Sequence, residues 1–271
     1  MSPTFPAPPR RSIPTRAQTW KVIENNDPAS VFLYPDTASS RAGITAVTRK
    51  LEGGPVALLG LGGTGSYTLD LLAKTPRKEI HLFDGDRFGQ HNAFRAPGAP
   101  SIEELKARPY KVDYFTSIYS RMRRGIVPHQ FHITSENVAL LEPMEFVFIC
   151  MDAGKAKLAV VEKLEAMSIP FVDVGMGVNI DETDSLRGIL RVTTSTKNKR
   201  DHVRANQRID FTGDGKNVYS QNIQIADLNA LNAALAVLKW KKMCGFYGAI
   251  KNKHFSAFTI DVGAIINDDF N

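Results

Sequence analysis

Cysteine is scarce in this 271-residue chain, and the two that occur, Cys150 and Cys244, do not form a C-x-x-C pair. A four-thiolate zinc site within the chain is therefore excluded, and a disulfide framework is not expected. No run approaches the ~20 uninterrupted apolar residues of a membrane span. The segment MSPTFPAPPRRSIPTR lacks the apolar core of a secretory signal, so we interpret it as a Pro-rich lead-in. These absences favour a cytoplasmic protein without membrane segments.

Charge is unevenly distributed along the chain. The net charge is +6, and the segment 191–208 alone combines six Lys or Arg with one acid, Asp201. A basic segment can bind nucleic acid or an acidic protein tail, or it can form a solvated face. Because no aromatic residues for base stacking are interleaved with these cations, nucleic acid is not the expected partner.

Short apolar runs predict the strands of a sheet. They cover residues 56–59, 79–83, 129–133, 146–150 and 170–174, with helical patterns between them. Strands that alternate with helices predict a mostly parallel, Rossmann-like α/β sheet with helices on both faces. After Val174 the pattern changes. The run GILRVTT and a final strand within HFSAFTIDV predict an extension by antiparallel strands, interrupted by a long loop at 193–220. We expect residues 1–50 to form a lead-in and extension, and residues 51–271 to form the domain.

Three helices follow from the spacing of apolar residues. SYTLDLLAK is expected to begin at a cap made by Thr64 or Ser66. LKARPYKVDYFTSIYSRM predicts a helix with Pro109 in its first turn or in a preceding loop. IADLNALNAALAVLKWKK is apolar on nearly all sides, which predicts a buried helix or a subunit contact.

The turn GLGGTG connects a predicted strand to a predicted helix. Gly60, Gly62 and Gly65 fit the pattern G-x-G-x-x-G, in which glycines let the backbone approach a phosphate at a helix N-terminus. The next strand ends in Asp84, whose carboxylate can accept hydrogen bonds from a ribose. The turn and the acid together indicate an adenosine nucleotide, either a dinucleotide or ATP.

The residues that follow favour ATP. A second acid, Asp86, an amide, Asn92, and two cations, Arg95 and Lys111, come next, and Asp152 follows a later strand. Cations and a carboxylate around a phosphate-binding turn suit a triphosphate with Mg²⁺ better than a pyrophosphate diester.

The segments GLGGTGS, DGDRFGQHNAFR, the Lys111 region and CMDAGKAK, in this order, resemble the ATP-binding core of the ThiF/MoeB/HesA family. That core is similar to the adenylation domains of ubiquitin-activating enzymes. The resemblance implies ATP and Mg²⁺ as cofactors and implies roles for named residues. Those at the nucleotide are Gly60, Gly62, Gly63, Gly65, Asp84, Asp86 and Asn92. Those in catalysis are Arg95, Lys111, Asp152 as the magnesium-associated acid, and Arg41, which would reach the triphosphate of a partner subunit.

The resemblance also implies a reaction and partners. The enzyme would adenylate the C-terminal glycine of a small ubiquitin-like or sulfur-carrier protein and release pyrophosphate. It would act as a homodimer, with a conjugating enzyme or sulfur donor downstream, and the basic segment 191–208 would guide the incoming tail. The loop 193–220 holds no cysteine for a thioester, and zinc-binding cysteine pairs are missing. Cys150 is expected to be buried inside a strand, and Cys244 to lie at a helix end away from the crevice.

Other interpretations remain open at this point. An enzyme of the same fold can act on a small molecule or tRNA, as the family's dehydratases do. A subunit can bind nucleotide without catalysis, and a nicotinamide oxidoreductase shares the glycine turn. Among single residues, Arg95 and Lys111 can be surface cations, Asp152 can be a helix N-cap, and Asp86 can support its own turn.

Overall fold

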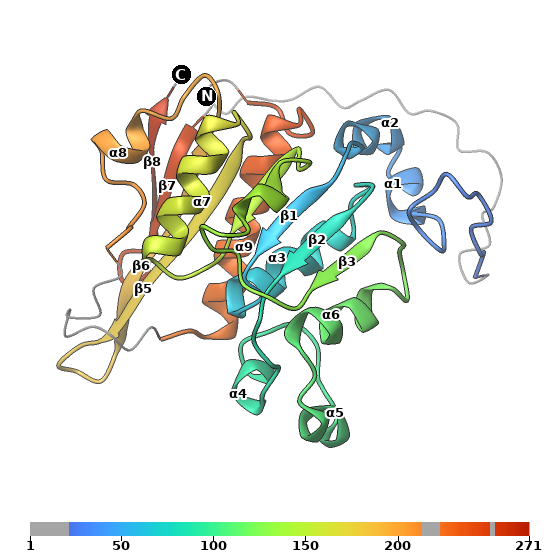
Figure 1. Cartoon of the computed structure of the whole chain (residues 1–271), viewed down its shortest axis with the longest axis horizontal. Helices are drawn as coiled ribbons and strands as arrows, with labels where there is room; N and C mark the ends of the chain where they lie inside the picture. The colour runs from blue at the N-terminus through green and yellow to red at the C-terminus, as the bar shows by residue number, and fades with distance from the viewer. Residues whose placement is uncertain (1–21, 213–222, 250–252, 271) are drawn as a thin grey trace, which may run out of the picture.

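The computed structural model describes residues 22–212, 223–249 and 253–270, which contain an eight-stranded sheet in the order β3-β2-β1-β4-β5-β6-β7-β8 (Figure 1). The strands are β1 (Val56–Leu59), β2 (Ile80–Phe83), β3 (Ile126–His129), β4 (Phe146–Ile149), β5 (Phe171–Ile180), β6 (Leu186–Ser195), β7 (Lys253–Thr259) and β8 (Ala264–Phe270). The strands β3, β2, β1, β4 and β5 pair in parallel, and β5 to β8 pair antiparallel. The predicted α/β fold with an antiparallel extension is confirmed.

Helices cover both faces of the parallel half of the sheet. Figure 1 shows α7 in front of the sheet and α3 and α9 behind it. The helices are α1 (Thr37–Arg41), α2 (Thr45–Thr48), α3 (Gly63–Ala73), α4 (Gln90–Ala93), α5 (Ile102–Ala107), α6 (Lys111–Tyr119), α7 (Lys155–Ala166), α8 (His202–Ala205) and α9 (Ala226–Met243), with short 3₁₀ helices at Arg49–Leu51 and Val138–Leu141. Because both faces are covered, β1 and β4 are buried along their whole length, as their unbroken apolar runs require. No helix in the described ranges is long and apolar enough to cross a membrane.

Strand β5 is longer than its parallel neighbour β4. Asp173 pairs with Ile149, the last residue of β4, and from Val174 onward β5 continues in register with β6. The hairpin of β5 and β6 therefore projects past the carboxyl ends of the parallel strands, where ligands of open α/β sheets bind.

Several local predictions were wrong. The third strand is Ile126–His129 rather than 129–133, because edge strand β3 is only half-buried and contains Pro128, which is tolerated at a sheet edge. The strand in HFSAFTIDV is followed by β8, so it is not the last. The long loop contains the short helix α8.

Two helix predictions also need correction. The helix α3 begins at the N-cap Gly62 without a side-chain cap from Thr64 or Ser66. In LKARPYKVDYFTSIYSRM, Pro109 lies in the segment before α6, as one of the two alternatives predicted, but the first residues of this stretch belong to a separate helix, α5, which ends at the left-handed Arg108 with φ 46°.

Candidate functional site

The glycine turn between β1 and α3 combines two packing glycines with one open position. Gly60 has φ +87°, and a Cβ there would lie 2.7 Å from the Cys150 carbonyl oxygen. A Cβ on Gly65 would lie 2.0 Å from the Gly60 carbonyl oxygen. Both positions therefore need glycine for the turn itself. Gly62 is different, because the nearest atom to its added Cβ would be 4.0 Å away, on Gln224. The N-cap of α3 is thus open to a ligand.

The carboxylate of Asp84 ties the glycine turn to the end of β2. It is buried and accepts hydrogen bonds from the backbone N–H of Leu61 at 2.6 Å and of Asp86 at 2.8 Å. Each carboxylate oxygen has two lone pairs, so Asp84 retains capacity for a ribose hydroxyl. Its first role is to hold the turn in shape.

Lys111 begins α6 and is buried rather than a surface cation. Its Nζ lies 2.6 Å from Asp86 Oδ2 and 3.6 Å from Asp84 Oδ2. The hydrogen bond from Lys111 holds the pKa of Asp86 below its usual value. Asp86 also supports its own turn, since its carbonyl accepts from the backbone N–H of Lys111. These three charges form one network at the β2 side of the turn.

Three further predicted residues lie apart from that network. Asn92 is buried in α4 and accepts from the backbone N–H of Gly89 at 2.9 Å. Arg95 is half-buried, and its Nε has no hydrogen-bond partner. Arg41 is exposed at the end of α1, whose Ser39 and Ser40 line a groove together with the residues that precede β1 and β2. Arg41 therefore lies at the amino ends of these strands, opposite the glycine turn (Figure 1).

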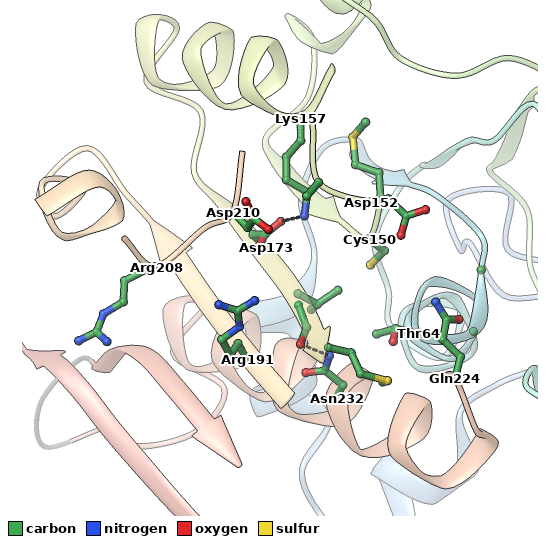
Figure 2. Close-up of a pocket in the computed structure, with 17 residues that line it drawn as sticks. Thr64, Cys150, Asp152, Lys157, Asp173, Arg191, Arg208, Asp210, Gln224 and Asn232 are labelled. Atoms are coloured by element: carbon green, nitrogen blue, oxygen red, sulfur yellow. Dashed lines mark hydrogen bonds and ion pairs between the residues drawn. The ribbon is translucent and has the colours of Figure 1, made fainter. Parts of the chain in front are cut away.

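A cavity of about 190 Å³ lies where the turn meets the carboxyl end of β4 and the projecting part of β5. It is lined by Gly62, Gly63, Thr64, Cys150, Met151, Asp152, Ala153, Lys157, Asp173, Val174, Gly175, Met176, Arg191, Arg208, Asp210, Gln224 and Asn232 (Figure 2). The exposed carboxylate of Asp152 is among them, and Gly154, not Asp152, is the N-cap of α7. The capping alternative for Asp152 is therefore wrong.

Asp152 is a single acid, and the described residues contain no group of three or more His, Cys, Asp or Glu placed to hold a metal ion. Magnesium in nucleotide sites takes one or two carboxylates and completes its shell with phosphate oxygens and waters. A lone carboxylate without a hydrogen bond, beside an open helix N-cap, fits that donor set.

A buried ion pair stands on the α7 side of the cavity. Lys157 Nζ lies 2.8 Å from Asp173 Oδ1, and both side chains are almost fully buried. Burial raises the pKa of Asp173, and the attraction of Lys157 only partly opposes this. In Figure 2 Lys157 reaches from its helix toward Asp173 and Asp210. Lys157 is the last residue of the segment CMDAGKAK that carries the family resemblance, but Asp173 was not expected because it lies within an apolar strand run.

The basic segment 191–208 is mostly anchored to the chain itself. Arg204 pairs with Glu165 at 2.5 Å, and Arg208 pairs with Asp268 at 2.5 Å and with Asp269 at 2.7 Å. Arg191 differs, because its guanidinium makes no hydrogen bond or ion pair within the residues that the structure describes, although its charge acts on Asp173 and Asp210.

Arg191 lies on β6 directly opposite Gly175 on β5. A Cβ on Gly175 would lie 3.5 Å from the guanidinium, an ordinary van der Waals contact, so the Arg191 side chain lies over β5 at this position. The only sequence signal for this arrangement was a lone cation in the apolar run GILRVTT.

The two cysteines lie at opposite ends of the parallel strands, Cys150 at the carboxyl ends and Cys244 at the amino ends. Cys150 directly follows β4 rather than lying inside it, and it is half-buried at the wall of the cavity, so the expected burial is confirmed only in part. Burial nevertheless raises its thiol pKa to about 12. Cys244 caps the end of α9, away from the cavity, and burial raises its pKa as well.

The comparisons with known proteins fit this geometry. The fold is similar to that of Escherichia coli MccB crystallised with ATP, at a TM-score of 0.65 and 16% identity over 88% of this chain and 72% of that one. A structure of the microcin C7 biosynthetic enzyme MccB with N-formylated MccA has a TM-score of 0.64 at 16% identity, over 86% and 69%. A structure of PaaA has a TM-score of 0.61 at 14% identity, also over 86% and 69%.

No curated protein sequence matches significantly. The ThiF family model, in contrast, matches residues 38–243, which include the glycine turn, the Asp84–Lys111 network and the cavity. With this match over most of its length, the chain belongs to the ThiF family.

Proposed function

We propose that this protein uses ATP to adenylate the terminal carboxylate of a partner peptide or small protein. Membership in the ThiF family supports ATP-dependent adenylation of a carboxylate. The observation that carries the proposal is the cavity itself, which lies beside an open helix N-cap. It is also lined by the carboxylate of Asp152 and the guanidinium of Arg191, and neither side chain makes a hydrogen bond or ion pair within the described residues.

The partner is a peptide or protein rather than a small metabolite. MccB, whose fold is similar, has been crystallised with MccA, and in one of these structures MccA is N-formylated. We extend this to a small ubiquitin-like or sulfur-carrier protein, whose extended tail is the form of substrate that the projecting hairpin of β5 and β6 can receive.

From the strand order we infer where each part of the substrates would bind. Adenosine would lie on the β2 side with its ribose at Asp84, the triphosphate would cross the N-cap of α3, and the carboxylate would enter from the β5 side toward Arg191. Asp152 would hold Mg²⁺, which neutralises phosphate charge when bound.

The reaction needs no proton transfer, because a carboxylate is already a nucleophile at neutral pH. A carboxylate oxygen forms a bond to the α-phosphorus of ATP, and the bond from that phosphorus to the bridging oxygen breaks. Pyrophosphate leaves with the bonding electrons. Lys111 and Arg95 would stabilise the negative charge on the phosphoryl oxygens and on the leaving group. Lys111 has first to release Asp86, which is exposed and can exchange that partner for water.

Arg41 can act only on a second copy of the chain. The parallel strand β1 has four residues, about 13 Å in length, and separates the amino-end groove at α1 from the glycine turn of the same chain. We propose that a homodimer brings Arg41 to the triphosphate of the partner subunit.

The function can be tested by following the fate of ATP. The protein is incubated with ATP, Mg²⁺ and peptides or carrier proteins that end in a free carboxylate, and hydroxylamine is added to trap an acyl-adenylate as a hydroxamate. We expect AMP, pyrophosphate and hydroxamate in equal amounts. Formation of ADP and phosphate without hydroxamate would contradict adenylation, as would the absence of ATP binding in calorimetry.

A further inference from the structure

Three lysines are buried in the described parts of the chain, and one of them differs from the others in its partners. Lys111 and Lys157 each have a carboxylate partner, at 2.6 Å and 2.8 Å. Lys239, on α9, makes no ion pair within the described residues. Its Nζ donates one hydrogen bond, to the neutral carbonyl oxygen of Lys253 at 2.5 Å. Lys239 is therefore a buried amine to which the described chain gives no counter-charge.

The surroundings of Lys239 disfavour its charge. Burial and the positive charges of Lys242 and Lys253 lower the pKa of Lys239 to about 7, and the carboxylate of Asp269 only partly opposes them. That carboxylate is already paired with Arg208 at 2.7 Å. A buried charge is costly unless an opposite charge and hydrogen bonds compensate it. An anion beside Nζ would supply the compensation that the other two buried lysines receive from the chain.

A cavity of about 230 Å³, the lysine cavity, lies between the C-terminal half of α9 and the antiparallel strands β6, β7 and β8. Its lining on α9 includes Leu235, Leu238, Lys239 and Lys242, whose i, i+3, i+4, i+7 spacing places them on one face of the helix. The residues that line it include no Asp or Glu. None of them lines the cavity beside the glycine turn, so the two cavities are separate.

The lysine cavity offers hydrogen-bond donors as well as positive charge. Ser256 on β7 pairs with Asn267 on β8, and Ser256 Oγ donates to Asn267 Oδ1 at 2.7 Å. This bond orients the amide, so the NH₂ group of the half-buried Asn267 keeps its donors. An ammonium has three N–H donors, and Lys239 spends one on the Lys253 carbonyl. Lys242 is exposed and makes no ion pair within the described residues.

The rest of the lining is largely apolar, which narrows the class of anion. Leu235, Leu238 and Met243 of α9 and Ile265 of β8 all line the lysine cavity. Leu238 is 39% exposed and Ile265 is 51% exposed, so apolar surface meets solvent here. A short alkyl chain gains free energy by covering such surface, whereas inorganic phosphate does not. The volume exceeds the ~150 Å³ that accommodates benzene, so a chain of about six carbons fits.

We propose that the lysine cavity is a binding site for a small aliphatic carboxylate. Its acid group pairs with the Lys239 ammonium and accepts from the Asn267 amide, and its chain covers Leu238 and Ile265. The site does not depend on the proposed adenylation, because no lining residue is shared between the two cavities.

Three probes separate the charge of the ligand from its chain. Hexanoate has both, hexanamide has the same chain without the charge, and inorganic phosphate has charge without a chain. Each is titrated at constant ionic strength and at about pH 6, where Lys239 is mostly protonated, and calorimetry follows binding. We expect hexanoate to bind with a dissociation constant of about 1 mM or lower, and the other two about tenfold or more weakly. Absence of hexanoate binding, or equal binding of either other probe, would overturn the proposal.

Four variants locate the binding. Lys239→Met removes the charge and should weaken hexanoate binding about tenfold or more. Lys241→Met makes the same change at the next position of α9, outside the cavity, and should bind like the wild type. Ile265→Asp adds a repelling charge at an exposed position, so it should weaken binding while the melting temperature stays unchanged. Arg191→Met, in the other cavity, should retain full hexanoate binding.

Wild-type affinity in both Lys239→Met and Ile265→Asp would overturn the proposal. Loss of hexanoate binding in Arg191→Met would also overturn it, because the carboxylate would then lie in the adenylation site. Hexanoate binding that depends on Lys239 and not on Arg191 would support the site even if the protein releases no pyrophosphate from ATP.

Discussion

Polar side chains at the two ends of the parallel strands differ in how many of their hydrogen bonds and ion pairs are made within the chain. At the amino ends, the buried Arg123 donates to the carbonyl oxygens of Thr75, Arg77 and Arg124. Arg77 pairs with Glu145 at 2.5 Å, although its Nε has no partner. At the carboxyl ends, the side chains of Arg191 and Asp152 make no hydrogen bond or ion pair within the described residues. Polar groups satisfied within the chain stabilise the fold, whereas those left unsatisfied at a cavity are available to a ligand.

The largest effect should come from Asp152. Asp152→Ala should lower ATP–pyrophosphate exchange by about 10²-fold or more, since the magnesium ion that we propose at this site would lose its protein ligand. The melting temperature should stay unchanged, because the side chain is exposed and makes no hydrogen bond. Glu162→Ala, an exposed acid on α7, is the matched control and should exchange at the wild-type rate. Near-normal exchange in Asp152→Ala would remove the magnesium role.

A pair of arginine variants tests the contrast between the two ends directly. Arg191→Met should raise the KM for a peptide substrate by about tenfold or more without altering stability, because it removes the cation for the carboxylate. Arg123→Met should lower the free energy of unfolding by about 3 kcal/mol, since it leaves buried carbonyls without donors, and should leave KM unchanged. Denaturant unfolding and steady-state kinetics measure both variants. Loss of stability in Arg191→Met, or a raised KM in Arg123→Met, would break the comparison.

Two neighbouring glycines sharpen the comparison within the turn. Gly62→Ala should fold normally and bind ATP several-fold more weakly, because the added methyl group faces the open N-cap. Gly63→Ala should cost about 1–3 kcal/mol of stability, because its Cβ would lie 2.0 Å from Asn229 Nδ2. Calorimetric ATP binding and thermal unfolding distinguish the two. Normal ATP affinity in Gly62→Ala would argue against a phosphate at this N-cap.

The smallest effect on activity should come from the cysteines. Burial raises the pKa of Cys150 to about 12, so the protonated thiol dominates at pH 8 and the thiolate forms only as pH rises toward that value. Native Cys150 should therefore resist iodoacetamide at pH 8 and react once urea unfolds the chain, as mass spectrometry can show.

The double variant Cys150→Ala, Cys244→Ser should keep full adenylation, with about 1–2 kcal/mol lost to the smaller side chain at position 150. Wild-type enzyme with ATP and a carrier protein should show no reducible adduct on a gel. An adduct that disappears with Cys244→Ser would identify a thioester that this structure does not favour, because Cys244 lies at the other end of the sheet.

Much of the site follows from local chemistry in the sequence. The turn needs Gly60 and Gly65 for close backbone approach, and Asp84 stands at the strand end where it can tie that turn. The strand predicted at 129–133 is β3 at Ile126–His129, and Pro128 lies within it because an edge strand tolerates proline. The pairing of Lys111 with Asp84 and Asp86 depends on how α6 packs and was not foreseen.

The sequence by itself determined the parallel core and the glycine turn between β1 and α3, because buried strands require unbroken apolar runs and a tight strand-to-helix turn requires glycine. Only the tertiary structure decided which polar groups share the cavity. Asp173, Arg191 and Asn232 lie on β5, β6 and α9, and each is unremarkable in its own segment. They lie close together because β5 extends beyond the end of β4 and α9 packs across the projecting part of β5. This arrangement depends on strand order and strand length, which no local sequence pattern encodes.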